Sequence, residues 1–106
     1  MSGTVEVSAG TYWSAASWLF DWVLTSTATM ASDPKLANQL SEIVAENLGW
    51  LSVSDLESPQ RDEFRRLVSR DLVVKARRDL PADLAERAAV LELIGALATT
   101  VQPLGD

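Results

Sequence analysis

Two carboxylates that stand alone among apolar residues are the first candidates for chemistry. On a helical wheel Asp71 falls on the apolar side of its helix, and Glu92 is the only charged residue from 88 to 98. An acid in such surroundings can have a raised pKa and act as a general acid or base. A structural role is the stronger interpretation, because Asp71 can pair with Lys75 one helical turn later. Nothing in the sequence brings the two acids to the separation that paired-acid hydrolysis needs.

Composition excludes other catalytic chemistry. The chain of 106 residues has no cysteine and no histidine. It therefore lacks a thiolate nucleophile, a thiolate metal ligand and the usual general base near neutral pH. The glycines are scattered singly and form no phosphate-binding loop. We therefore expect a protein that is not an enzyme and that holds no cofactor and no metal ion.

Tryptophans offer a chemistry of binding instead. Trp13, Trp18 and Trp22 lie within ten residues of one another. Large aromatic side chains are good core residues and also frequent hot spots of protein interfaces. We expect Trp13 in the core. Trp18 and Trp22 border a polar stripe on its far side from Trp13, so core packing and a recognition surface both stay open for them.

Charge is distributed unevenly along the chain. The formal net charge is −6, yet seven of the nine basic residues fall between 59 and 79, where the net charge is +3. On a helical wheel Arg66, Arg70 and Arg77 share one side, with Glu63 beside them. Most such faces are simply solvated, because an exposed ion pair contributes only ~0–1 kcal/mol. The alternatives are a docking strip for an acidic protein and a phosphate contact, which the interleaved acids and the net negative charge oppose.

Helices are expected to position these side chains, since leucine and alanine make up more than a quarter of the chain. Apolar residues at three- and four-residue spacing predict four main helices and one short helical turn. The helices span about 11–30, 34–48, 59–78 and 82–100, and the turn lies near 54–57. Asp33-Pro34 and Ser58-Pro59 fit helix starts, and Gly49 fits a helix terminator. Residues 5–7 alternate like a strand, but no second strand is evident to pair with them.

The predicted fold class is therefore all-α, a compact bundle of four main helices in a single domain over 1–106. Residues 1–10 and 102–106 are expected to be loosely ordered tails. The apolar stretch 12–24 is thirteen residues long and contains Asp21, whereas a membrane-spanning helix needs about 20 apolar residues. The first ten residues contain no basic residue, unlike a secretory signal. We expect a cytoplasmic protein without a membrane segment.

Shape and charge presented from a helical scaffold are thus the expected means of action. The leading hypothesis is a small acidic module that binds another protein, a basic one by charge complementarity, and neutralises or regulates it. Immunity proteins, antitoxins and small inhibitors act in this way. The predicted partner-binding residues are Trp18, Trp22, Arg66, Arg70 and Arg77. One alternative is a nucleic-acid-binding regulator that uses the arginine-rich third helix, and the other is a self-associating subunit such as a homodimer.

Overall fold

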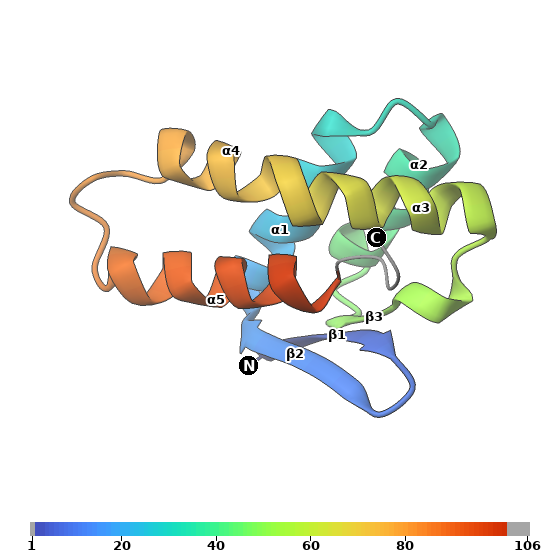
Figure 1. Ribbon diagram of the computed structural model, residues 1–106, viewed down its shortest axis with the longest axis horizontal. Coiled ribbons are helices and arrows are strands. Elements are labelled where there is room, and N and C mark those ends of the chain that lie inside the picture. The colour runs from blue at the N-terminus through green and yellow to red at the C-terminus, as the bar shows by residue number, and fades with distance from the viewer. Residues whose placement is uncertain (1, 102–106) are drawn as a thin grey trace.

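A three-stranded sheet packs against a layer of helices in the computed structural model, which describes residues 2–101 (Figure 1). β1 (Ser2–Ser8) and β2 (Thr11–Ala16) form an antiparallel hairpin, and β3 (Trp50–Ser52) runs parallel to β1 on its other side. The order β2-β1-β3 leaves β3 at one edge of the sheet. The helices lie on one face of the sheet, and no other described segment covers the opposite face (Figure 1).

Buried and more exposed residues alternate along both strands of the hairpin, as expected for β-strands. In β1, Gly3, Val5 and Val7 are buried, while the residues between them are half-buried. In β2 the buried positions are Trp13 and Ala15. The apolar side chains among these residues join the hydrophobic core beneath the helices.

The prediction of an all-α helical bundle is therefore wrong. Residues 11–16, expected to begin the first helix, form β2, and most of the predicted tail 1–10 is β1. The apolar richness of 12–24 masked the change of period from two to about 3.6 where β2 passes into the first helix. No local sequence pattern reveals β3, which pairs with residues 5 and 6, because β3 is only three residues long and follows a helix.

Four helical stretches form the layer above the sheet. They are α1 (Ser17–Met30), α2 (Pro34–Ala45), a rod made of α3 (Ser58–Arg66) and α4 (Leu72–Asp79), and α5 (Arg87–Thr100). A π-helical segment over Leu67–Asp71 joins α3 to α4, so the helix predicted over 59–78 is continuous but contains one wider turn. The predicted turn near 54–57 is a 3₁₀ turn over Val53–Asp55.

Two helix ends differ from their predicted positions. α2 ends at Ala45 rather than near 48, and both Asn47 and Gly49 then take positive φ angles, of 54° and 66°. α5 begins at Arg87 rather than near 82, because Glu86 before it adopts a left-handed conformation with a φ of 57°. The predicted tail 102–106 lies outside the described residues. Over 2–101 no helix is long and apolar enough to cross a membrane.

The two lone carboxylates both lie at the surface. Asp71 ends the π-helical segment, whose wider turn rotates it away from the apolar face on which the helical wheel placed it. Lys75 pairs with Asp79, at 2.9 Å, rather than with Asp71. Neither Asp71 nor Glu92 therefore has the apolar surroundings that suggested acid–base chemistry.

Glu63 ties the α3–α4 rod to the start of α2. Its side chain is only 8% exposed. Oε2 accepts hydrogen bonds from the hydroxyl and the backbone N–H of Ser32, the latter at 3.1 Å, and Oε1 accepts one from the backbone N–H of Asp33, at 3.1 Å. The Ser32 hydroxyl above all lowers the pKa of Glu63, and the two backbone N–H groups and Arg66 add to this effect against the opposing effect of burial.

The start of α2 is capped as the sequence predicts. Asp33 Oδ1 accepts a hydrogen bond from the backbone N–H of Lys35 at 2.9 Å, and Pro34 opens the helix. Asp33 Oδ2 accepts a second bond from Gln60 Nε2 at 2.7 Å. The Gln60 bond, followed by the Lys35 bond, lowers the pKa of Asp33. α3 thus fixes the N-terminal end of α2, which sets the direction in which α2 runs.

Trp13 joins the sheet to α5 and is buried, as predicted for a core residue. Its indole Nε1 donates a hydrogen bond to the carbonyl oxygen of Leu93 at 2.8 Å. We expect Trp13→Phe to lower the free energy of unfolding by about 2 kcal/mol, because this bond and part of the buried ring are lost. Urea unfolding followed by circular dichroism measures the change. Trp18→Phe is the matched control, since Trp18 is 48% exposed and should change stability by less than about 0.5 kcal/mol. Equal losses in the two variants would contradict the role of Trp13.

Candidate binding groove

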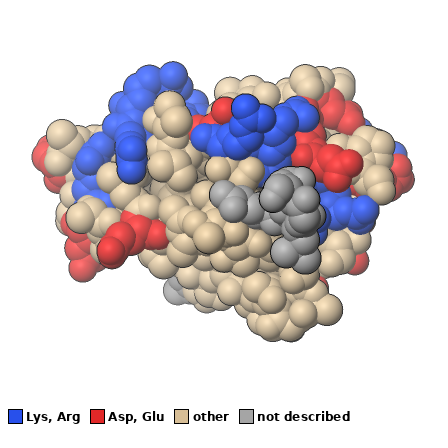
Figure 2. Space-filling view, in the orientation of Figure 1, with Lys and Arg blue, Asp and Glu red and all other residues tan. Residues whose placement is uncertain are grey.

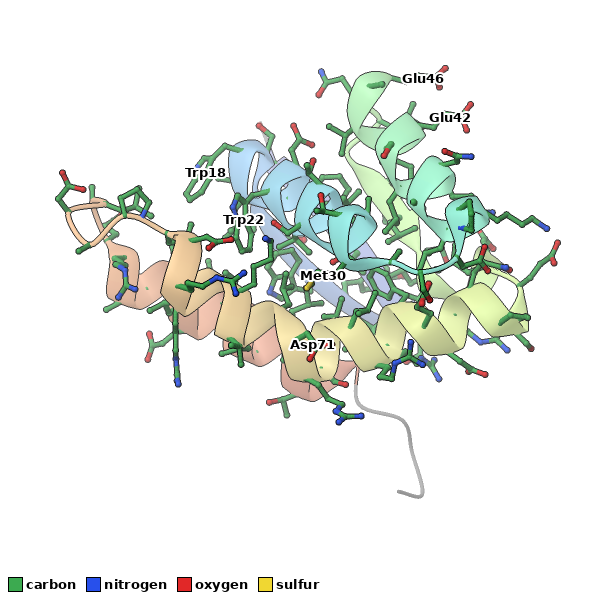
Figure 3. All side chains as sticks on the ribbon, turned by 90° about the horizontal axis from the view of Figure 1, so that it is seen from above. Trp18, Trp22, Met30, Glu42, Glu46 and Asp71 are labelled. Carbon is green, nitrogen blue, oxygen red and sulfur yellow. The ribbon has the colours of Figure 1, made fainter. Side chains whose placement is uncertain are left out.

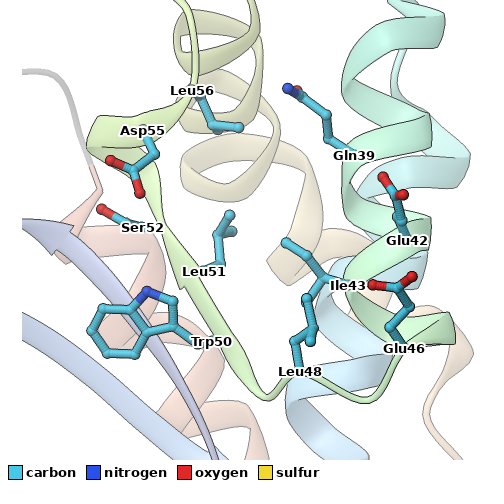
Figure 4. A pocket seen from close by; sticks show the side chains of 10 residues that line it. All are labelled: Gln39, Glu42, Ile43, Glu46, Leu48, Trp50, Leu51, Ser52, Asp55 and Leu56. Atoms are coloured by element: carbon cyan, nitrogen blue, oxygen red, sulfur yellow. The ribbon is translucent and has the colours of Figure 1, made fainter.

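A groove of about 430 Å³ lies between α2 and β3 (Figure 4). One wall is α2, the other is β3 with the 3₁₀ turn that follows it, and apolar side chains form the floor between them. The lining residues are Gln39, Glu42, Ile43, Glu46, Leu48, Trp50, Leu51, Ser52, Asp55 and Leu56.

A chain reversal over residues 46–49 connects the two walls of the groove. Asn47 and Gly49, with their positive φ angles, turn the chain back after α2. The Gly49 carbonyl then accepts a hydrogen bond from the Thr4 backbone N–H at 2.9 Å, which places β3 on β1. Glu42 on α2 and Glu46, the residue that follows the last residue of α2, are four residues apart and lie along the same wall (Figure 4).

Large apolar side chains are exposed at this groove. Leu48 is 57% exposed and Trp50 is 46% exposed. Tyr12, on the hairpin, places its ring 6.2 Å from that of Trp50, at an interplanar angle of 46°. We call Tyr12, Leu48 and Trp50 the apolar patch. Exposed aromatic and aliphatic side chains grouped in this way are typical of surfaces that bind other molecules.

The charged residues that line the groove are all acidic. Glu42, Glu46 and Asp55 are exposed. None of the three forms an ion pair with any of the residues from 2 to 101. A fourth acid, Glu6, lies on the strand beside β3, where its Oε1 accepts a hydrogen bond from Ser52 Oγ at 3.0 Å. The groove therefore presents negative charge above an apolar floor.

Gln39 contributes an unsatisfied polar atom. Its Oε1 is buried and has no hydrogen-bond partner in the described part of the chain. A buried acceptor without a donor is costly, by about 1–3 kcal/mol. Figure 4 shows the Gln39 side chain projecting from α2 across the groove toward the side of Leu56.

The arrangement suits binding a cation-bearing ligand more than it suits catalysis. Carboxylates attract lysine and arginine, and the indole face of Trp50 can stack against a cation. No cluster of three acidic side chains over residues 2–101 is placed to hold a metal ion. The groove thus combines apolar contact with negative charge.

The predicted tryptophans lie on α1, outside the groove. Trp18 is exposed, whereas Trp22 is half-buried and packs against the core. Figure 3 shows both side chains on the same side of α1. Trp18 also lines a second hollow, of about 360 Å³, with Leu84 and Leu93 among its other lining residues.

The predicted arginines lie on the α3–α4 rod, also outside the groove. Arg66, Arg70 and Arg77 are exposed, and Arg66 pairs with Glu63 at 3.3 Å. Figure 2 shows Lys and Arg side chains in the upper half of the view, with Asp and Glu side chains next to them. Trp18 and Trp22 lie on α1 and the arginines lie on the rod, and no hydrogen bond within residues 2–101 joins the two groups. Their role in binding stays a prediction.

Sequence reasoning missed most of the groove, although two signals pointed toward it. Residues 1–58 carry seven acids against one base, and two of these acids, Glu42 and Glu46, are four residues apart. Leu48 and Trp50 flank a glycine at a helix end, where a large apolar side chain is readily left at the surface. The wall opposite Glu42 and Glu46 is formed by β3, and the sequence patterns did not predict β3.

No protein-family model, no curated protein and no solved structure matches the chain. The chemistry of the groove and of the surface around it is therefore the guide to function.

Proposed function

We propose that this chain is a small non-enzymatic module that binds another protein, and that the α2–β3 groove holds a basic segment of that partner. The proposal depends on three acids, Glu42, Glu46 and Asp55, that form no ion pair within residues 2–101 and surround exposed apolar side chains. A lysine or arginine side chain matches both parts of such a groove. Its aliphatic stem covers apolar surface while its charged end reaches a carboxylate.

The biological role that fits this proposal is neutralisation or regulation of a basic partner in the cytoplasm. An immunity protein, an antitoxin or a small inhibitor needs a folded body and a surface complementary to its target. Electrostatic complementarity supports fast and specific association with a basic target, and the net charge of this chain is −6. A chain without cysteine also needs no oxidising compartment for its fold.

The proposal predicts the outcome of a peptide selection. A displayed library of random twelve-residue peptides, panned against the chain, should enrich lysine and arginine together with apolar residues. The triple variant Glu42→Gln, Glu46→Gln, Asp55→Asn should bind the selected peptides about 10-fold more weakly, since each exposed charge contributes up to ~1 kcal/mol. Raising the salt concentration should also weaken binding of the selected peptides to the unmodified chain, because salt screens the attraction between charges.

The matched control removes three other exposed acids. The variant Asp62→Asn, Asp83→Asn, Glu92→Gln changes the net charge by the same amount, and none of these three residues lines the groove. Its affinity for the selected peptides should stay within about 2-fold of the unmodified chain. Equal losses in the two triple variants, or a selection without enrichment of basic residues, would overturn the proposal.

A further inference from the structure

Within residues 2–101, the outer edge of β3 makes no backbone hydrogen bond, because β3 pairs only with β1. β3 is the last strand in the order β2-β1-β3. Thr4 N–H bonds the carbonyl of Gly49, so Gly49 directs its carbonyl toward β1. In a parallel pair the backbone groups of alternate residues face the neighbouring strand. Leu51 therefore faces β1 as Gly49 does, and the backbone N–H groups of Trp50 and Ser52 point the other way.

This open edge borders the groove. β3 forms one wall of the groove and α2 forms the other (Figure 4). An edge strand with free backbone groups is a template for pairing with a further strand, and many peptides are recognised by such strand addition. The space beside β3 is therefore lined on one side by backbone donors and below by apolar side chains.

We propose that the groove takes an extended segment of the partner, which pairs with β3 as a fourth strand and alternates basic with apolar residues. This inference rests on the proposed function, because it specifies how the basic segment is held. Successive side chains of a strand point to opposite faces of the sheet. In Figure 4, Trp50 and Asp55 lie on one side of β3, and Leu51 lies on the other, facing Ile43.

The two faces of the added strand would meet different chemistry. On the face of Leu51 and Ile43, the strand contacts the apolar floor, which favours valine or a similar side chain. On the opposite face it contacts the indole of Trp50 and the carboxylate of Asp55, which favour lysine or arginine. The alternation follows from the alternation within β3 itself, where Trp50 is exposed and Leu51 is buried.

Gln39 supports an extended ligand in particular. A strand that pairs with β3 through one edge turns its other edge toward α2. The Gln39 side chain projects from α2 toward this space (Figure 4), and its Oε1, which is shielded from solvent, has no partner in the described residues. When the Gln39 amide turns toward the groove, a backbone N–H on the far edge of the added strand supplies the missing donor. A helical ligand would keep its backbone N–H groups within its own turns and leave Gln39 unsatisfied.

The test uses a defined probe, the capped peptide acetyl-Lys-Val-Lys-Val-Lys-Val-Lys-amide, and amide hydrogen exchange of the isotope-labelled chain measured by NMR. When the peptide saturates the chain, the amides of Trp50 and Ser52 should exchange at least about 10-fold more slowly than in the free chain. Each amide then donates a hydrogen bond to the added strand or is covered by it. The peptide with proline in place of each valine has the same charge but cannot pair along its length. It should bind at least about 10-fold more weakly.

The outcomes separate this inference from the proposed function. Binding that is lost in the triple variant Glu42→Gln, Glu46→Gln, Asp55→Asn, without slower exchange at Trp50 and Ser52, would overturn strand pairing and leave the proposed function standing. Equal affinity for the valine and proline peptides would do the same. An absence of binding at millimolar peptide would overturn both. Slower exchange together with weak binding of the proline peptide would support the inference.

Discussion

Gly3→Ala is expected to lower the free energy of unfolding by about 3 kcal/mol, at the upper end of what an added methyl group causes in a packed core. A Cβ atom at this position would lie 2.2 Å from Cγ and 2.4 Å from Cβ of Phe20. Phe20 is fully buried in α1, so its ring has no free space into which it can move. Either β1 separates from α1 or the ring leaves its rotamer, and both changes disturb the contact between sheet and helices.

Urea unfolding followed by tryptophan fluorescence measures this loss. Gly95→Ala is the matched control, because a Cβ atom at Gly95 meets no atom within 4 Å and the residue lies inside α5. Alanine has a higher helix propensity than glycine, so this variant should be more stable by roughly 0.8 kcal/mol. The same substitution should thus change stability in opposite directions at the two sites. A Gly3→Ala variant as stable as the unmodified chain would show that β1 and α1 are not in such close contact.

Glu63→Ala is expected to lower the free energy of unfolding by roughly 3 kcal/mol. The substitution leaves two backbone N–H groups and the Ser32 hydroxyl without their acceptor, and an unsatisfied buried donor costs about 1–3 kcal/mol. Water that enters the site would satisfy some of these groups, so the expected loss of stability is smaller than the sum of the penalties for the three donors. Glu63→Gln keeps the shape and one acceptor oxygen, and should lose about half as much.

The pH dependence of stability tests the same interaction independently. The pKa values of Glu63 and Asp33 are both lowered in the folded chain. A carboxyl group with a lowered pKa stabilises the fold above its ordinary pKa, and this stability is lost as the pH falls through the folded value. The ordinary values are 4.5 for Glu63 and 3.8 for Asp33, so the free energy of unfolding should decline below about pH 4.5.

The Glu63→Gln variant should show a shallower decline with acid, since only Asp33 of this pair still titrates. Thermal unfolding between pH 7 and pH 3 measures the two curves. Asp62→Asn is the control, because Asp62 is exposed and precedes Glu63 in α3. Its curve should run parallel to that of the unmodified chain. A parallel curve for Glu63→Gln would contradict the assignment of acid sensitivity to Glu63.

The helices could be predicted from the sequence because their signals are local. The Asp33-Pro34 start of α2 is confirmed by the bond from the Lys35 N–H to Asp33 Oδ1. The period of apolar residues located the α3–α4 rod and most of α5. These features depend on residues close together in the chain, so the sequence alone contains the information that determines them.

The sheet and the groove depend instead on contacts between distant residues. Val5 pairs with Trp13 on one side and with Leu51 on the other, and the second contact spans much of the chain. A three-residue strand such as β3 carries too few positions to show a period of two. α2 and β3 together form the groove, so local sequence patterns, which do not reveal β3, point to Trp18 and to the arginines instead.

The wider turn in the middle of the α3–α4 rod also affects how its cations are displayed. A π turn accommodates an additional residue, so everything after it is rotated by roughly a quarter of a revolution relative to an uninterrupted α-helix. Phe64, Val68 and Leu72 can thereby stay buried at a constant step of four. Arg66 and Arg77 consequently point in different directions from the axis of the α3–α4 rod. A straight polyanion lying along the rod would contact them one at a time and not as a row.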